Sequence, residues 1–257
     1  AAELSSAVVG SFDGDQVNNI RVSPRSIVID LRLKGNIEDA KREILRFVKI
    51  KQRGTIKWTQ NKRTVVINGI VEAIDMPRWN NGVTMQITLH CSVPYWEDID
   101  SVVTEITEAI GLHYFTETVD DMLYFPIDGI PFGEYDISRS KDFYNAGDVD
   151  VGMQIEITAY DTVTNPIIYA SNGEFFGVGY GTGDKSVVMS AGDKIVIKTG
   201  RNAKSVVLNN TTNLLSKVKP LSTWLQMKAG DNTFIVNSDD ESIRNMIFAI
   251  EFKQRYI

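Results

Sequence analysis

The sequence predicts a mainly β protein of the α+β class with two domains, residues 1–125 and residues 126–257. Apolar and polar residues alternate in many short stretches, which is the period of a strand with one buried face. Only two stretches have helical spacing instead. The chain has 257 residues, more than a typical domain of roughly 100–150, so a division into two domains is expected.

Composition and charge exclude several classes of function. Hydrophobic residues make up 43% of the chain and charged residues 23%, which is ordinary for a globular protein with a sizeable core. The net charge of −6 argues against a dedicated nucleic-acid binder. No apolar run approaches the ~20 residues that span a bilayer, so no membrane partner is expected. The single cysteine excludes an internal disulfide and a CxxC metal site.

A strand and a helix open the first domain. The stretch "SIVIDLRLKG" has apolar residues at every second position and predicts a strand. The helix is predicted over residues 36–51, with Asn36 as N-cap, Lys49 and Lys51 in the last turn and Gly54 as the terminating residue. Its apolar face is expected to consist of Ile37, Ala40, Ile44, Phe47 and Val48.

Three further strands follow. "GTIKWTQ" and "RTVVINGIVEAID" are separated by a turn at Asn61, and residues 83–93 form the next strand after a turn at "RWNNG". Pro94 is expected to end it, because proline has no N–H to donate to a neighbouring strand. His90 and Cys91 are adjacent on this strand and therefore point to opposite faces. We expect Cys91 in the core, and no thiolate–imidazole pair.

The stretch between the two domains predicts a helix and a boundary. "DSVVTEITEAIG", residues 100–111, has apolar residues at helical spacing and ends in glycine, so a second short helix is expected. "YFPIDGIPFGEYD", residues 124–136, contains two prolines and two glycines and is typical of a domain boundary.

The second domain is predicted to be an antiparallel β-sandwich, because many short strands are separated by turns containing Gly173, Gly192 and Gly230. The strands are predicted in "GMQIEITAY", "NPIIYAS", "GEFFGVGYG", "KSVVMSAG", "KIVIKTG", "KSVVLN", "NTFIVNS" and "NMIFAIEFKQRYI".

Catalytic patterns are not found. His90 and His113 have no metal-ligand spacing, and no GxSxG nucleophile elbow occurs. We therefore expect no enzyme, and we assign no catalytic residue, metal ligand or cofactor. A pocket with convergent carboxylates, such as two of Asp120, Asp121 and Asp128, would favour a hydrolase instead.

Two loops resemble ligand-binding motifs only in part. In "GVGYGTGDKS", residues 177–186, Asp184 precedes Lys185 and breaks the phosphate-binding pattern, so a hairpin loop is favoured. "NSDDES", residues 237–242, lacks the spacing and glycine of an EF-hand, so an acidic turn in solvent is favoured over a calcium site.

Aromatic residues leave a sugar-binding function open. A sandwich of the galectin or carbohydrate-binding-module type can stack a sugar ring on exposed aromatic side chains, although such side chains mostly pack in the core. Tyr180 and Trp224 are the candidate sugar contacts. The aromatic residues considered are Tyr169, Phe175, Phe176, Tyr180 and Trp224. The alternative function is therefore a carbohydrate-binding module with an accessory domain.

The order of several stretches resembles a known family. "RSIVIDLRLKG", the following helix and the strands ending in "CSVPYW" form one group. "NAGDVDVGMQIEITA", "SAGDKIVIKTGRNAKSVVLN" and "LSTWLQMKAGDNTF" form a second. In this order they resemble the N-terminal belt domain and the C-terminal sandwich of the distal tail (Dit) proteins of phages with long non-contractile tails, the siphophages. The family has additional strands ahead of the segment that begins here, so we expect residues 1–125 to lack the first strands, and residues 173–183 do not align.

The resemblance implies a structural role in the virion, at the tail tip, after assembly in the bacterial cytoplasm. Proteins of this family form rings, typically of six copies, that join the tail tube to the baseplate and its receptor-binding proteins and surround the DNA channel. DNA is expected to pass through without specific binding.

Physical arguments agree with such a ring. A closed ring needs two different contact surfaces on each subunit. "RTVVINGIV" has apolar residues on both faces and would supply one of them, unless it is simply a core strand. We expect a channel surface that is negative or neutral, because a basic surface would retain DNA.

Overall fold

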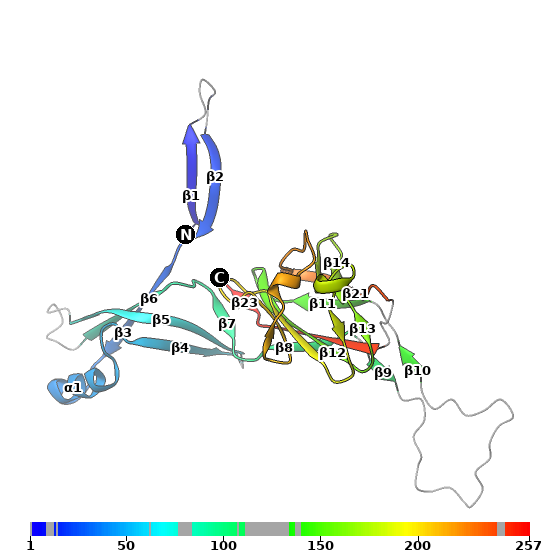
Figure 1. The fold of residues 1–257 in the computed structure, drawn as a ribbon. Coiled ribbons are helices and arrows are strands. Elements are labelled where there is room, and N and C mark those ends of the chain that lie inside the picture. Colours follow the sequence, from blue (N-terminus) through cyan, green and yellow to red (C-terminus); the bar gives the residue numbers. More distant parts are fainter. Residues whose placement is uncertain are drawn as a thin grey trace, which may run out of the picture. The chain divides into compact units, whose positions relative to one another are not determined.

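Antiparallel β-sheets form both units into which the computed structural model divides the chain (Figure 1). The N-terminal unit comprises Ala1–Ile99 with Arg255–Ile257, and the C-terminal unit comprises Asp100–Gln254. None of the described helices is long and apolar enough to cross a membrane. The structure describes residues 2–8, 13, 15–61, 63–76, 84–106, 108–110, 134–136, 140–240 and 245–257.

The division between the units lies before Asp100, whereas the sequence predicts it at residue 125. The reason is β8 (Val102–Glu105), which pairs with β22 (Met246–Phe252) of the C-terminal unit. Most of the predicted boundary stretch lies outside the described residues. Its last part, β10 (Glu134–Asp136), pairs with β9 (Glu108–Ile110).

The N-terminal unit is built on one antiparallel sheet with the order β23-β7-β5-β6-β3, and β4 pairs with β5. Strands β3, β4, β5 and β6 and the turn at Asn61 confirm the predictions from the sequence. Strand β7 was not predicted, and β23 was predicted as part of the last strand of the second domain. The predicted turn at "RWNNG" lies outside the described residues. The bounds are β3 (Arg25–Arg32), β4 (Arg53–Gln60), β5 (Arg63–Asp75), β6 (Thr84–Cys91), β7 (Trp96–Asp98) and β23 (Arg255–Tyr256).

The start of helix α1 (Ile37–Phe47) is as predicted. Asn36 accepts a hydrogen bond from the Glu38 N–H at 3.2 Å through its side-chain oxygen, and its amide donates to Asp39 at 2.7 Å. Both acidic residues lie in the first turn, where the helix dipole favours negative charge. The half-buried residues Ile44 and Val48 pack against one face of the sheet, as predicted.

The predicted end of this helix is wrong. Helix α1 ends at Phe47, so Lys49 and Lys51 follow it, while Gly54 lies within β4. The chain leaves the helix early because the backbone N–H of Lys51 donates a hydrogen bond to the Val71 carbonyl at 2.8 Å. This bond holds the segment after the helix against β5. Phe47 is 72% exposed and does not belong to the face that contacts the sheet.

The first strands of the chain form a separate two-stranded hairpin that the sequence analysis missed. β1 (Ala2–Val8) pairs with β2 (Asp15–Val22). Within the described residues, neither strand pairs with the main sheet. Every described side chain of β2 is exposed.

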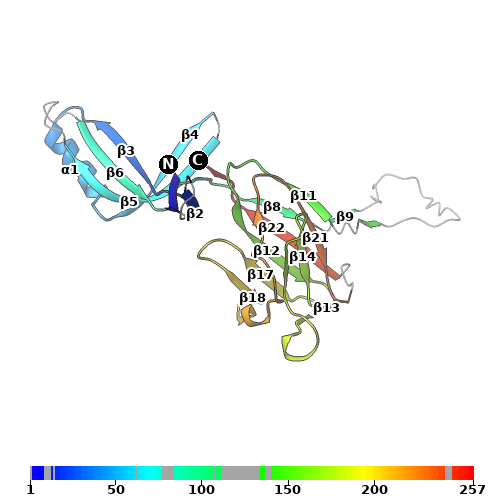
Figure 2. The same ribbon diagram turned by 90° about the horizontal axis from the view of Figure 1, so that it is seen from above.

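The C-terminal unit is an antiparallel β-sandwich, as predicted, and Figure 2 shows its strands from above. One sheet has the order β19-β18-β17-β12-β22-β8, with β20 on β12, and the other has the order β11-β21-β14-β15. Large buried side chains such as Ile155, Phe176 and Phe248 form the core. Eight strands coincide with the predicted stretches: β12 (Val151–Ala159), β14 (Ile167–Ala170), β15 (Phe175–Gly177), β16 (Val188–Met189), β17 (Lys194–Lys198), β18 (Ser205–Leu208), β21 (Gly230–Asn237) and β22. Four strands have no counterpart among the predicted stretches: β11 (Ser140–Asn145), β13 (Val163–Thr164), β19 (Thr212–Asn213) and β20 (Gln226–Met227).

Two predictions for this unit are wrong. Residues 100–111 were expected to form a helix, but β8 and β9 occupy this stretch. In β8, half-buried Val102 precedes Val103, which is 60% exposed, so the side chains alternate as in a strand. Residues 177–186 are not a hairpin loop, because β15 before them pairs with β14 whereas β16 after them pairs with β13.

Turns in this unit are held by side chains that bond to the backbone. The Asp193 carboxylate accepts hydrogen bonds from the Ser190 N–H and from the Asn209 amide, both at 2.8 Å. The preceding Gly192 has φ +89°, which favours glycine. Asn145, which is buried, holds a similar turn by donating to the carbonyls of Val149 and Met227.

The Asp193 turn predicts a dependence of stability on pH. The two hydrogen bonds, that from the Ser190 N–H first, lower the pKa of Asp193. The carboxylate therefore stabilises the fold at pH values above its unfolded pKa of about 4, and this contribution is lost as the pH falls through the folded pKa. We expect Asp193→Asn to lower the urea midpoint at pH 6 by more than it does at pH 3. An equal decrease at both pH values would contradict the role of the charge.

Candidate assembly surfaces of the N-terminal unit

Cys91 and His90 lie on opposite faces of β6, as predicted. Cys91 is fully buried, and burial raises the pKa of its thiol, an effect that nearby Arg25 partly opposes. His90 is half-buried on the other face. The two side chains therefore do not form a catalytic pair. The other titratable candidates, His113, Asp120, Asp121 and Asp128, lie outside the described residues.

The acidic turn of residues 237–242, where it is described, is bound to Thr164 and Asn165. Asp239 accepts a hydrogen bond from the Asn165 amide at 2.7 Å, and Asp240 accepts one from the Thr164 N–H at 2.9 Å. No group of three or more His, Cys, Asp or Glu side chains that could hold a metal ion occurs in the described part of the chain.

The two candidate sugar contacts are both half-buried. Trp224 packs on the core, with its ring 4.8 Å from that of Phe176 and with the Lys204 ammonium 5.3 Å from its centre. Sugar contact at Tyr180 and Trp224 stays a prediction. Binding of the protein to a glycan array, lost in Tyr180→Ala, would support it.

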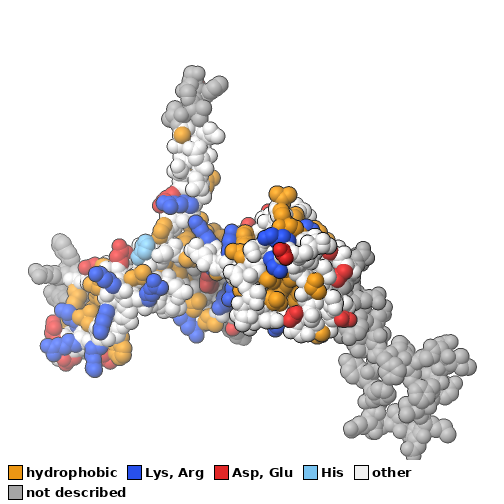
Figure 3. Space-filling view, viewed as in Figure 1, with side chains coloured by type: hydrophobic (Ala, Val, Ile, Leu, Met, Phe, Trp, Pro, Cys, Tyr) orange, Lys and Arg blue, Asp and Glu red, His pale blue; other side chains and the backbone are white. Residues whose placement is uncertain are grey.

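The N-terminal unit has a small core and a large amount of exposed apolar surface. Its cluster of buried residues consists of Val71, Ile87 and Leu89, with partly buried neighbours around them. Many of the large hydrophobic side chains that are exposed in the described chain belong to this unit although it is the smaller one: Leu4, Val17, Ile20, Val22, Val28, Leu45, Phe47, Ile50, Trp58, Ile70, Val93 and Ile99. Figure 3 shows hydrophobic side chains between charged ones over α1. Such surface is typical of protein–protein contacts.

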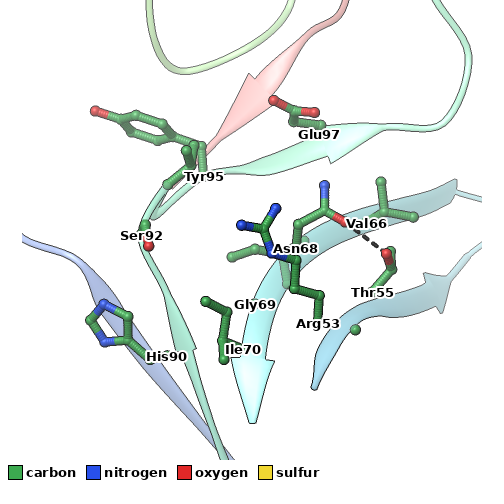
Figure 4. A pocket seen from close by; sticks show the side chains of 13 residues that line it. Arg53, Thr55, Val66, Asn68, Gly69, Ile70, His90, Ser92, Tyr95 and Glu97 are labelled. Atoms are coloured by element: carbon green, nitrogen blue, oxygen red, sulfur yellow. Dashed lines mark hydrogen bonds between the residues drawn. The ribbon is translucent and has the colours of Figure 1, made fainter. Parts of the chain in front are cut away.

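The main sheet has one face covered by α1 and one face that is largely polar, although it also carries Val28 and Ile70. Residues that pair on neighbouring strands share a face. Asn68 of β5 pairs with Thr55 of β4, and Ile70, two residues further along β5, pairs with His90 of β6. All four residues therefore lie on the same face. We call this second face the polar face. Its polar residues include Ser26, Thr55, Asn68, Gln86, Thr88 and His90. An open depression of about 540 Å³ lies on it, and Figure 4 shows the Thr55 hydroxyl bonded to Asn68 there, at 2.7 Å.

Charges of both signs lie on the polar face. Arg53 on β4 lines the depression, and Asp30 on β3 accepts a hydrogen bond from Gln86 at 3.0 Å. Glu97 of β7 pairs with Arg255 of β23 at 2.6 Å, so these two charges neutralise each other. Neither a strongly basic nor a strongly acidic surface results.

The last strand of the chain is tied to the N-terminal unit by side chains as well as by its pairing with β7. Tyr256 donates its hydroxyl proton to Asp98 at 2.8 Å, and the Arg63 guanidinium lies 3.4 Å from the centre of the Tyr256 ring. The sequence therefore ends in the unit in which it begins.

Comparisons with known proteins agree with this fold. Residues 146–256 match the family model described as siphovirus-type tail component, C-terminal domain. The crystal structure of the Dit protein of phage SPP1, a paradigm of the hub adsorption apparatus in Gram-positive infecting phages, has a TM-score of 0.62 at 15% identity, covering 98% of this chain and 88% of that chain. A chain of the phage P2 baseplate in its activated conformation has a TM-score of 0.43 at 13% identity, covering 100% and 88%. No curated protein matches the sequence.

The β-rich fold and the family model define the class: this is a structural component of a siphovirus-type phage tail. Its C-terminal sandwich belongs to the siphovirus-type tail component family. Over the whole chain the fold is similar to that of the SPP1 Dit protein, and residues 146–256 match a tail-component family, which agrees with the resemblance to distal tail proteins seen in the sequence. The family is one of structural tail components rather than enzymes.

Proposed function

We propose that the protein assembles into a closed ring, expected to contain six copies, that joins the tail tube to the host-adhesion apparatus and surrounds the channel for DNA. The observation that carries this proposal is the exposed apolar surface of the N-terminal unit. Many of its large hydrophobic side chains are exposed, whereas its cluster of buried residues is small. A ring closed by rotation places two different patches of each subunit in contact, so a subunit of this kind needs much more apolar surface than a monomer.

The polar face supports the second part of the proposal, a channel that lets DNA slide. A surface rich in Lys and Arg would neutralise phosphates, release counterions and so bind DNA strongly at low salt. The polar face carries uncharged Thr, Asn, Gln and Ser side chains, with charges of both signs among them. We infer that it lines the channel.

The ring is tested by the native mass of the purified protein, from light scattering, together with electron microscopy. The proposal expects rings, with the polar face of each sheet on the inner surface of the map. A map in which the polar face lies on the outer surface would contradict the channel assignment. Rings absent both alone and in the presence of the tail-tube protein would contradict the ring itself.

Adding positive charge to the polar face should make the channel hold DNA. Thr55 and Asn68 are both exposed, so the double variant Thr55→Lys/Asn68→Lys is expected to keep the fold. Because its charges converge in a closed lumen, its rings should bind linear duplex DNA at 50 mM salt and lose most of that affinity at about 200 mM. They should not bind closed circular DNA, which has no end to thread.

The matched control places the same charge elsewhere. Thr211 and Thr212 are exposed in the C-terminal unit, so Thr211→Lys/Thr212→Lys adds equal charge outside the proposed lumen. This control should bind linear and circular DNA equally. Equal binding of both DNA forms by the Thr55/Asn68 variant would contradict the assignment of the polar face to the channel.

A further inference from the structure

The hairpin of β1 and β2 has one apolar face, and that face is uncovered. Leu4 lies directly opposite Ile20, and Ala2 opposite Val22. Residues paired or spaced by two share a face, so Leu4, Val17, Ile20 and Val22 point the same way. We call them the hairpin face. Leu4 and Ile20 are each 65% exposed.

The opposite side of the hairpin is polar. Glu3 and Arg21 are opposite each other there and form an ion pair, with Arg21 Nε donating to the Glu3 carboxylate at 2.6 Å. Ser5 pairs with Asn19 on the same side. The hairpin is therefore amphipathic, like a strand pair with one buried face.

A β-bulge keeps the apolar residues together. The register shifts between Ser5 and Ser6, so that Ser5 pairs with Asn19 but Ser6 pairs with Val17. Without the shift, the alternation of side chains would place Val17 on the polar side. Bulges of this kind re-aim side chains, and this one aligns Val17 with Ile20. Such alignment matters only if the hairpin face is buried.

A two-stranded hairpin is marginally stable in water by itself and needs further packing. Among the described residues, β1 and β2 pair only with each other. The hairpin face therefore requires a surface to cover it, and that surface must be apolar.

Two hollows on the described part of the N-terminal unit have apolar side chains in their lining, and the larger of them fits this need. It lies beside α1 and has a volume of about 960 Å³. We call it the helix groove. Its apolar lining consists of Ile37, Leu45, Val48, Ile50, Ile74, Met76 and Met85. Ile50 is 56% exposed, and the charged residues Glu38, Lys41 and Lys49 also line the groove.

The geometry of the chain favours the groove of a neighbouring copy. Only Ser23 and Pro24 separate β2 from β3, and a residue before proline is held extended. The chain direction therefore continues from β2 into β3 instead of reversing. The groove lies at the far end of β3, where Leu31 pairs with Met85.

We propose that the hairpin face of one copy docks into the helix groove of the next copy. The proposal rests on the proposed ring, and it names the two patches that form its subunit contact. Hairpin and groove are different surfaces, so the contact is heterologous, which is the kind of contact that forms a ring when the rotation between neighbouring subunits closes.

The test uses two variants of the full chain and their mixture. Leu4→Ser/Ile20→Ser alters the hairpin face, and Leu45→Ser/Ile50→Ser alters the groove. Each variant alone should be monomeric by light scattering where the wild type forms rings. An equimolar mixture should give dimers but no rings, because each mixed pair keeps one intact hairpin and one intact groove. The control Gln16→Ser/Asn19→Ser changes the polar side of the hairpin and should form wild-type rings.

A cysteine pair tests the contact directly. Native Cys91 is fully buried, so Ile20→Cys/Ile50→Cys adds the accessible thiols. Under a bifunctional thiol cross-linker we expect a ladder of linked subunits up to the full ring. Linkage only within one chain would show that the hairpin covers its own groove and would overturn the proposal. Rings in both serine variants would also overturn it and leave the proposed function standing, whereas a wild type without rings and without a ladder would overturn both.

Discussion

Gly152→Ala is expected to destabilise the C-terminal unit by about 3 kcal/mol, because an added methyl group has no room there. Gly152 lies on β12, where the chain passes close to Gly200. A Cβ atom at Gly152 would collide with the Gly200 Cα and lie only 2.7 Å from the Gly200 nitrogen. The obstacle is backbone, so no side chain can rotate away.

Side-chain hydrogen bonds from Thr199 also hold the two chain segments together next to Gly152 and Gly200. The buried Thr199 hydroxyl accepts from the Met153 N–H at 2.9 Å and donates to the Met153 carbonyl at 3.2 Å. Relief of the collision would break this pair of bonds. Hydrogen exchange of the β12 and β17 amides in increasing urea would report the stability of this unit separately from the other, which a single transition does not.

Gly200→Ala is the matched control. A Cβ atom at Gly200 would meet only the Ala203 Cβ at 3.9 Å, an ordinary contact, so the expected change in the free energy of unfolding is within about 0.5 kcal/mol. Equal effects of the two substitutions would contradict the collision at Gly152.

Asn165→Ala should have the second large effect, also about 3 kcal/mol, because it removes three hydrogen bonds and leaves the buried Val187 N–H unpaired. Asn165 is 2% exposed. Its oxygen accepts from the Val187 N–H at 2.8 Å, and its amide donates to Asp239 at 2.7 Å and to the Gly181 carbonyl at 3.1 Å. These bonds hold the connection between β15 and β16 against the start of the acidic turn.

The backbone at Asn165 adds to the expected loss. Its φ of +52° is in the left-handed region, which asparagine tolerates better than alanine. Asn165→Gly removes the same hydrogen bonds without this strain, so it should be less destabilising than Asn165→Ala. Thermal unfolding and the exchange of the Val187 amide would measure both. A fully protected Val187 amide in either variant would contradict the role of the side chain.

Several elements could be predicted because their signals are local. The alternation in "RSIVIDLR" and "TMQITLHC" specifies strands with one buried face, and both lie where expected. Asn36 as N-cap marked the start of α1, whereas β6 ends at Cys91, before the end at Pro94 that the sequence predicts. Cys91 was placed in the core by its position in the alternation alone.

Other elements could not be predicted because distant residues decide them. Val102 and Val103 fit helical spacing as well as a strand, and pairing with β22 settles the choice. The bulge between Ser5 and Ser6 breaks the alternation in the first hairpin, which hides its pattern in the sequence. The end of α1 depends on the bond from Lys51 to Val71, a partner 20 residues further along the chain.

The candidate assembly surfaces, too, could be predicted only in part from the sequence. The sequence by itself indicated the resemblance to a family, the fold class and the absence of a catalytic motif, since these depend on residue order and on local periodicity. Only the tertiary structure decided which apolar residues stay uncovered. Phe47, Ile50 and Ile20 look like core residues in the sequence, and they are exposed because, in the part of the unit that the structure describes, α1 covers one face of the sheet and no strand or helix covers the hairpin face. Burial depends on what packs against a residue, and that is a property of the folded chain.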